Sequence, residues 1–314
     1  DMKTVVKDLK GIIGNNIFAK ASDYLALAKP RVMYLAIFTA FVGIIIAPGH
    51  LPPSQTMLTI IAIALGAASA GALNMWYDAD IDSIMSRTNE RPIPSGRVSS
   101  KGALLFGLIT SLLSILLLAA VTNMAAACLL AFTIFFYAVI YTMWLKFLTP
   151  HNIVIGGAAG ALPPLIGWTA VTGTVSLQST TLFLIIFLWT PPHFWALALF
   201  RSRDYEDAGI PMMPVIAGGR STRKQIFVYS LALAPSGLMP WFMGPASAFY
   251  ACFAALLGAV FVWKAWNVLT ICSDDQSFRS EKQLFIYSIK YLFLVFSALL
   301  IDKLIFHILW PLLP

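Results

Sequence analysis

Three oxygen-bearing side chains recur at a four-residue spacing near the end of an apolar stretch: Asn74, Asp78 and Asp82. On a helix this spacing places all three on one face, and Asp80 points away from it. Carboxylates one turn apart repel each other, and the negative end of the helix dipole adds to the repulsion. We therefore expect a compensating cation. Oxygen ligands without His or Cys favour Mg²⁺ where phosphates take part, so the cluster predicts a platform for a metal ion and a diphosphate.

A second acidic cluster follows a later apolar stretch and contains Asp204, Glu206 and Asp207. Asp204 and Asp207 are three residues apart and could share a helix face, after which Gly209 and Pro211 end the helix. Two such platforms at one end of a bundle could hold metal ions on both sides of a diphosphate. The alternative for each cluster is an ordinary charged loop, in which the acids pair with neighbouring arginines.

Two basic residues stand at the edges of apolar stretches: Arg31 just inside the first, and Lys146 just after the fourth. Cations at such positions in a membrane protein are candidates for function. A diphosphate needs neutralisation, which Arg provides with two parallel hydrogen bonds and Lys as a point charge. The alternative is that both side chains extend to lipid headgroups.

His193 lies inside a long apolar stretch, directly after Pro191 and Pro192. We expect the two prolines to break or kink that helix and to open space for a ligand. A lone histidine at such a place is more often a packed, hydrogen-bonded residue. The competing hypothesis is that it binds a planar acceptor such as a metalloporphyrin.

The elements that position these residues are set by the composition of the chain. Its 314 residues are 59% hydrophobic and 11% charged, and the mean hydropathy is +0.81. A soluble domain needs more charge to cover its surface, so we predict an all-α polytopic membrane bundle of about nine transmembrane helices. The expected spans are 30–48, 55–76, 102–121, 123–144, 152–171, 179–200, 225–242, 246–267 and 284–308.

Lys and Arg occur in the N-terminal tail and in every second connection between these spans, and the intervening connections have none. Basic residues favour the cytoplasmic side, so we predict the N-terminus inside and the C-terminus outside. The net charge of +7 then reflects topology and indicates no nucleic-acid partner. The predicted organisation is a tail over 1–28 and a transmembrane domain over 29–314, with cytoplasmic connections near 77–101 and 201–224.

The motifs of the chain resemble those of the UbiA-type intramembrane prenyltransferases, and within that family the branch that acts on protohaem. Met75 follows Asn74 where many quinone-type relatives have an acid, and the second acidic motif has fewer aspartates than theirs. The motifs that carry the resemblance are Lys29-Pro30-Arg31-Val32, the run from Asn74 to Asp82, Arg87-Thr88, Arg91 to Gly96, Tyr141-Thr142 with Lys146, Thr149 to Gly160, Thr190 to Trp195, and Asp204 to Pro214.

The resemblance implies a Mg²⁺-dependent transfer of the farnesyl group of farnesyl diphosphate to a vinyl group of protohaem IX, giving haem O and diphosphate. The implied metal ligands are Asn74, Asp78, Asp82, Asp204 and Asp207. The implied catalytic residues are Asp78, Asp82, Asp204 and Lys146, and the implied diphosphate-binding residues are Arg31, Arg87, Arg91 and Lys146. His193, Trp195 and Tyr141 are the implied haem or acceptor pocket.

Other functions remain open at the level of the sequence. The same metal site would serve a UbiA-type enzyme that prenylates an aromatic acceptor of a quinone or chlorophyll pathway. A cation or metabolite transporter, or a structural subunit that handles haem, is a further alternative. The candidate partners besides the lipid bilayer are a second copy of the chain and proteins of the haem pathway or of oxidase assembly. The first 25 or so residues lack the pattern of a signal or transit sequence, which favours a bacterial cytoplasmic membrane.

Overall fold

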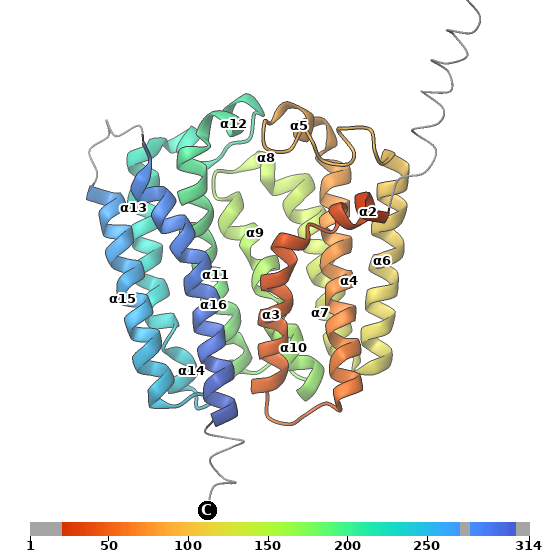
Figure 1. The fold of residues 1–314 in the computed structure, drawn as a ribbon, viewed down its shortest axis with the longest axis vertical. Helices are drawn as coiled ribbons and strands as arrows, with labels where there is room; N and C mark the ends of the chain where they lie inside the picture. Colours follow the sequence, from red (N-terminus) through yellow and green to blue (C-terminus); the bar gives the residue numbers. More distant parts are fainter. Residues whose placement is uncertain (1–20, 271–276, 306–314) are drawn as a thin grey trace, which may run out of the picture.

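A computed structural model describes residues 21–270 and 277–305, and for Arg31 and Val32 it describes the backbone alone. Over these residues the chain is helical and contains no strand, which confirms the all-α prediction (Figure 1). Most of the predicted tail over 1–28 lies outside the described residues, as does the end of the last predicted span. Residues Ala21–Leu27 form the short helix α2.

Nine helical segments correspond to the nine predicted spans within the described part of the chain. Seven of them are long and apolar enough to cross a membrane. The segments are α3 (Pro30–Ile46), α4 (Pro53–Tyr77), α6 (Ser100–Val121), α7 with η1 and α8 (Met124–Phe135, Phe136–Leu145 and Lys146–Leu148), α9 with α10 (Asn152–Ala161 and Pro163–Thr172), α11 (Leu177–Phe200), α13 (Met213–Ser236), α15 (Ala248–Thr270) and α16 (Arg279–Asp302). Three short helices lie at the ends of the bundle, namely α5 (Ala79–Ile84), α12 (Ser202–Asp207) and α14 (Met239–Phe242).

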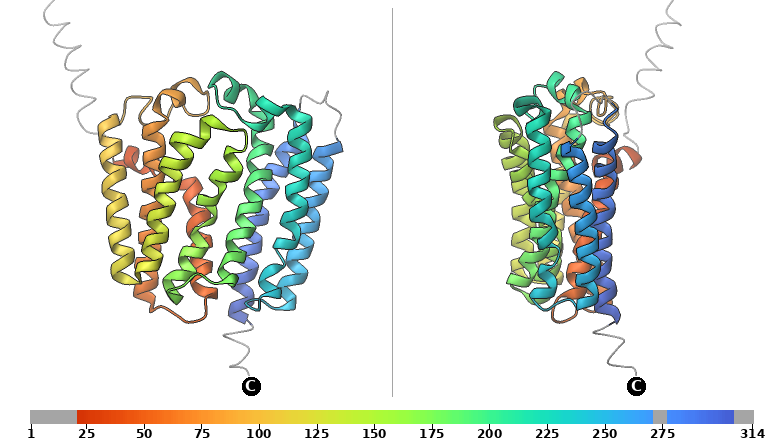
Figure 2. Two further views of the ribbon diagram at one scale, coloured as in Figure 1. Left: turned by 180° about the vertical axis from the view of Figure 1, so that it is seen from behind. Right: turned by 90° about the vertical axis from the view of Figure 1, so that its left-hand side faces the viewer.

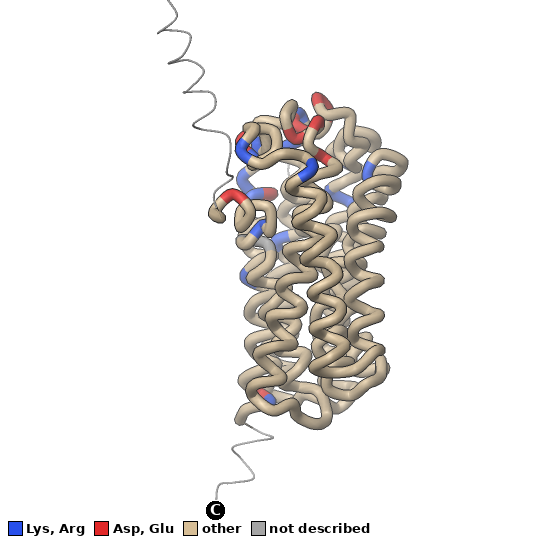
Figure 3. The backbone as a smooth tube through the Cα atoms, turned by 90° about the vertical axis from the view of Figure 1, so that its right-hand side faces the viewer, with Lys and Arg blue, Asp and Glu red and all other residues tan. Residues whose placement is uncertain are grey.

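The helices run side by side, with α5 and α12 together at one end (Figures 1 and 2). Acidic and basic residues gather at this same end, and the body of the bundle is almost free of them (Figure 3). We call it the polar end. One core cluster joins α11, α13, α15 and α16 around Trp195, Tyr250 and Phe296, and a second joins α3, α4, α6, α7 and α10 around Leu118 and Ile166.

The structure corrects two expectations about helix boundaries. The connection over 201–224 is shorter than predicted, because α13 begins at Met213, although Gly218 with φ 76° interrupts its helical backbone. Pro191 and Pro192 do not break α11, which is continuous from Leu177 to Phe200, and the alternative that they kink it stays a prediction. Each proline removes one backbone hydrogen bond, but α11 packs against α9, α13 and α16, and these contacts hold the helix together.

The fourth span changes from α-helix to π-helix over Phe136–Leu145. The wider turn stacks the rings of Tyr137 and Tyr141, whose centroids are 5.5 Å apart. Tyr141 lies directly on Gly156 of α9, where a Cβ atom would come within 2.2 Å of the ring. Gly156 thus lets η1 approach α9 closely at the level of the polar end. Short π-helical segments are frequently found at functional sites.

Candidate active site

The first acidic cluster sits at the junction of two helices. α4 ends at Tyr77, and Asp78 is followed at once by α5. Asn74, Asp78 and Asp82 are all nearly inaccessible to solvent, with 5%, 2% and 3% of their surfaces exposed, whereas Asp80 is exposed. The four-residue spacing therefore produces one buried polar face, and α5 extends it past the end of α4.

Asn74 is the centre of a hydrogen-bond network. Its Nδ2 donates to Oδ2 of Asp78 at 2.8 Å and to the hydroxyl of Thr142 in η1 at 3.0 Å. Its Oδ1 accepts a hydrogen bond from the amine of Lys29, the residue that precedes α3. Lys29 has φ 52° and ψ 56°, a left-handed conformation that turns the chain from α2 into α3. The network thus joins three segments that are far apart in the sequence.

Both carboxylates of this cluster are paired with cations. Nζ of Lys146 lies 2.7 Å from Oδ2 of Asp78, and Nη1 of Arg91 lies 2.6 Å from Oδ2 of Asp82. These pairs offset the repulsion that the sequence predicts between the two acids. Two of the predicted diphosphate-binding residues, Lys146 and Arg91, are therefore at the cluster.

The second cluster meets the first through the connection that follows α5. The hydroxyl of Ser86 donates to Oδ1 of Asp204 at 2.9 Å. Arg87 hydrogen bonds to Tyr205, and burial raises the pKa of this phenol, so it stays protonated. Met85 packs against Tyr205 in an apolar cluster. α12 is therefore fixed to the segment after α5 by polar and apolar contacts.

The remaining predicted residues lie differently. Arg87 is exposed and reaches α12 instead of the first cluster. Asp207 and Glu206 are exposed, and Asp207 makes no ion pair with a described residue. Arg31 is in α3, but its side chain lies outside the described part of the structure.

The donor atoms suit a hard divalent cation. Oδ1 of Asp78 is buried without a hydrogen-bond partner, and so is Oδ2 of Asp204, whose nearest cation is Nη1 of Arg201 at 3.8 Å. Within the described residues, one carboxylate oxygen on each cluster thus accepts no hydrogen bond. The described residues form no ready group of three His, Cys, Asp or Glu side chains around a metal position. A cation at this site would need further oxygen ligands, which phosphate and water supply to Mg²⁺.

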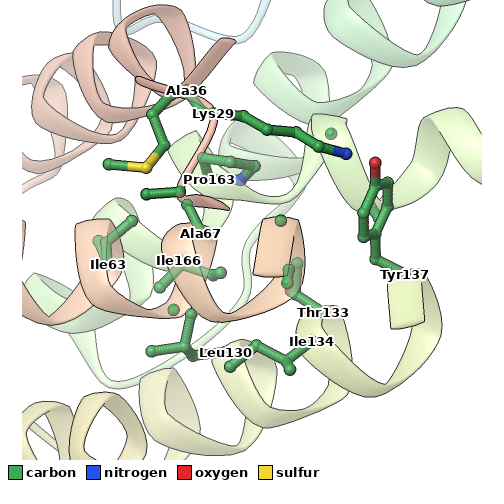
Figure 4. Close-up of a pocket in the computed structure, with 17 residues that line it drawn as sticks. Lys29, Ala36, Ile63, Ala67, Leu130, Thr133, Ile134, Tyr137, Pro163 and Ile166 are labelled. Carbon is green, nitrogen blue, oxygen red and sulfur yellow. The ribbon is translucent and has the colours of Figure 1, made fainter. Parts of the chain in front are cut away.

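An apolar cavity of about 150 Å³ lies beneath the polar network (Figure 4). Apolar residues of α3, α4, α7, α9 and α10 line it, among them Ile63, Leu130 and Ile166. Lys29 and Tyr137 point toward one another at its polar side (Figure 4). Because Lys29 also contacts Asn74, the cavity adjoins the acidic cluster directly. The arrangement can hold a molecule with an anionic head and a long apolar chain.

The three predicted acceptor residues contact different parts of the bundle. His193 is buried against α16 and hydrogen bonds to Ser288. Trp195 is fully buried and packs edge-on against Tyr229 of α13, with a ring-centroid distance of 5.5 Å. Tyr141 lies on Gly156 of α9. None of the three lines the apolar cavity, and their grouping into one acceptor pocket stays a prediction.

Sequence reasoning assigned no role to Lys29, Thr142 or Ser86. Lys29 and Thr142 stand in motifs that the family resemblance already singles out, and this was the available signal. For Ser86 there was none. Ser86 looks like an ordinary exposed serine in a charged connection, and its contact with Asp204 depends on the position of α12.

Comparison with known proteins agrees with this geometry. The UbiA prenyltransferase family matches the chain over residues 36–289. A relative from Mesorhizobium japonicum, protoheme IX farnesyltransferase 2, is 60% identical over 287 residues, which cover 91% of each chain. The protoheme IX farnesyltransferase of Agrobacterium fabrum is 57% identical over 284 residues, which cover 90% of each chain.

Solved structures with the same fold are more distant in sequence. A UbiA homologue from Aeropyrum pernix has a TM-score of 0.71 at 17% identity, covering 86% of this chain and 98% of its own. A UbiA homologue from Archaeoglobus fulgidus has a TM-score of 0.63 at 16% identity, covering 88% of this chain and 99% of its own. The polar network, the cavity and the family match together lead to one conclusion: the chain belongs to the UbiA prenyltransferase family.

Proposed function

We propose that the protein transfers the farnesyl group of farnesyl diphosphate to a vinyl group of protohaem IX and so forms haem O. The observation that carries this is the joining of the two acidic clusters beside an apolar cavity, through Asn74 and Lys29 on one side and Ser86 and Asp204 on the other. The curated relatives that are 57–60% identical carry the name protoheme IX farnesyltransferase, which supports protohaem as the acceptor.

The donor is expected to bind with its diphosphate between the two clusters and its chain in the apolar cavity. The proposed ligands of Mg²⁺, together with the diphosphate, are the oxygens of Asp78 and Asp204 that accept no hydrogen bond from the described residues. The Archaeoglobus fulgidus homologue is described as bound to GPP and Mg²⁺, which supports this use of the fold. When bound, Mg²⁺ supplies positive charge to the leaving diphosphate.

The residues of the chain then assist the separation of charge. The C–O bond of the farnesyl diphosphate breaks, the electron pair leaves with the diphosphate, and the allylic carbon becomes positive. Lys146 and Arg91 already lie at the cluster, and they are positioned to transfer their hydrogen bonds from the carboxylates to the diphosphate. Prearranged charges of this kind lower the barrier without reorganisation.

The acceptor completes the reaction. The vinyl carbon of protohaem attacks the allylic carbon, and the resulting cation beside the porphyrin takes hydroxide from water, with release of one proton. The apolar lining of the cavity keeps water from the allylic cation until the vinyl group arrives. No nucleophile of the protein is required.

We also propose that the polar end faces the cytoplasm of a bacterium, with the N-terminus inside and the C-terminus outside. The crowding of charge at the end that carries α5 and α12 supports this orientation (Figure 3). The donor diphosphate and Mg²⁺ are then available on the same side as the acidic clusters.

The test is product analysis with purified protein, farnesyl diphosphate, Mg²⁺ and either protohaem or 4-hydroxybenzoate. We expect a mass that corresponds to haem O from the first mixture and no prenylated product from the second. A prenylated benzoate without haem O would contradict the proposed acceptor. Flux across proteoliposomes without any chemical product would contradict prenyl transfer itself.

A further inference from the structure

His193 has surroundings that define its orientation and its proton. It lies in α11 with 8% of its surface exposed, and its Nδ1 is 2.6 Å from the hydroxyl oxygen of Ser288 in α16. Its ring stacks on Trp189, with centroids 4.3 Å apart and planes at 16°, and on Phe285, at 4.7 Å and 21°. The imidazole is held by one hydrogen bond and by aromatic rings on its faces, so its plane is fixed.

The hydrogen bonds of Ser288 determine the tautomer of His193. The single hydroxyl proton of Ser288 is donated to the carbonyl oxygen of Phe285 at 2.6 Å. With its proton in this bond, the hydroxyl accepts from the imidazole, so we assign the proton of the neutral ring to Nδ1. Nε2 is left with a lone pair, and none of the described residues hydrogen bonds to it. The indole of Trp189 donates to the backbone oxygen of Ser288 at 2.7 Å, which fixes the serine in place.

The anchoring of α11 to α16 uses only Nδ1 of His193, and Nε2 has no hydrogen-bond partner among the described residues. The arrangement has the form of a metal ligand. A neutral imidazole that donates from one nitrogen to a fixed acceptor presents the other nitrogen to a metal. A metal approaches in the plane of the ring, whereas Trp189 and Phe285 stack on its faces.

The position of His193 suits the acceptor. It lies about 10 Å along the helix from Phe200, at 1.5 Å per residue, and so beneath the polar end. The apolar cavity for the donor chain lies among other helices, α3, α4, α7, α9 and α10. The two substrates would thus approach the acidic clusters from different parts of the bundle.

We propose that Nε2 of His193 is an axial ligand of the protohaem iron when the acceptor is bound. This inference rests on the proposed function, because it assumes that protohaem is the acceptor. Iron ligation fixes the centre of the porphyrin, and the vinyl edge is then presented at a constant distance from α11. His193 holds the substrate, and the hydroxyl of Ser288 acts through it as a positioning group.

The experiment is a titration of the full-length protein in detergent with ferric and ferrous haem, followed by absorption and resonance Raman spectroscopy. We expect an iron–histidine signature in the wild type and in the controls His50→Ala and His151→Ala, which change exposed histidines. His193→Ala and His193→Gln should lose the signature, and imidazole added to His193→Ala should restore ligation. The glutamine variant keeps a hydrogen-bonding side chain at this position. It therefore separates loss of iron ligation from loss of folding.

Ser288→Ala gives a second readout that a purely structural contact would not change. Without its acceptor, the Nδ1 proton polarises the ring less, so the iron–histidine stretch should move to lower frequency and haem affinity should fall about tenfold. An unchanged haem spectrum in both His193 variants overturns the inference, even if the wild type makes haem O. Loss of the signature in these variants without haem O formation by the wild type supports ligation and overturns the proposed function instead.

Discussion

Ser86 donates a hydrogen bond to Oδ1 of Asp204 at 2.9 Å, although the two residues lie on connections 118 positions apart in the chain. The contact joins the segment after α5 to α12 and leaves Oδ2 of Asp204 without a hydrogen-bond partner. The contact therefore ties the segment that follows the first acidic cluster to the helix that carries the second.

Loss of this contact should weaken the site without destroying it. Ser86→Ala removes one hydrogen bond to a charged group, worth about 1 kcal/mol, so kcat/KM should fall about fivefold. The matched control is Ser83→Ala, because the hydroxyl of Ser83 bonds only to the backbone oxygen of Asp80 at 2.6 Å. Steady-state haem O formation measures both variants. Equal activities would show that the Ser86 contact does not support the site.

Asp78 is expected to be essential, and Asp80 is not. Asp78→Asn removes the charge that Lys146 pairs with, and it weakens the free oxygen proposed for Mg²⁺. We expect kcat to fall by about 10²–10³ while the protein still inserts in the membrane. Asp80→Asn makes the same chemical change on the exposed side of α5 and should retain wild-type turnover. Wild-type turnover by purified Asp78→Asn would refute the metal assignment.

Lys29 should matter for donor binding. Its amine contacts Asn74 and borders the apolar cavity, so it lies where the diphosphate meets the isoprenoid chain. Lys29→Met keeps most of the length of the side chain and loses the charge, and KM for farnesyl diphosphate should rise about tenfold. Lys101→Met, at an exposed position in α6, is the control. The prediction is wrong if both variants have the same KM.

Activity should depend on a divalent cation. Treatment with excess chelator should abolish haem O formation, and added Mg²⁺ should restore it, because the two free carboxylate oxygens need a bridging charge to hold a diphosphate. The measurement is product mass against Mg²⁺ concentration. Full activity in excess chelator would contradict the proposal.

Gly160 offers a test of the cavity. It lines the cavity, and a Cβ atom placed there meets nothing within 4 Å. Gly160→Leu should fill part of the space and shift the preference from farnesyl toward geranyl diphosphate, with farnesyl transfer lowered about tenfold. Ala120→Leu, on an exposed position of α6, adds the same volume outside the cavity. The measurement is competition between the two donors, followed by product mass. An unchanged preference would contradict the assignment of the cavity.

The sequence alone determined the class of the protein and the first acidic cluster. Composition and apolar length required a membrane bundle, since that much apolar surface has no other solvent. The spacing of Asn74, Asp78 and Asp82 produced one buried face, because helical periodicity is local and continues from α4 into α5. These properties depend on neighbours in the chain and need no knowledge of distant contacts.

Only the tertiary structure decided which distant groups complete the site. The partners of the first cluster, Lys29, Thr142, Lys146 and Arg91, depend on how α3, η1 and the connection after α5 pack. The change to π-helix in η1 and the continuity of α11 through two prolines depend on packing as well, because contacts with neighbouring helices outweigh local preference. A long-range contact also positions the ring of His193, since Ser288 reaches its Nδ1 from a helix 95 positions away.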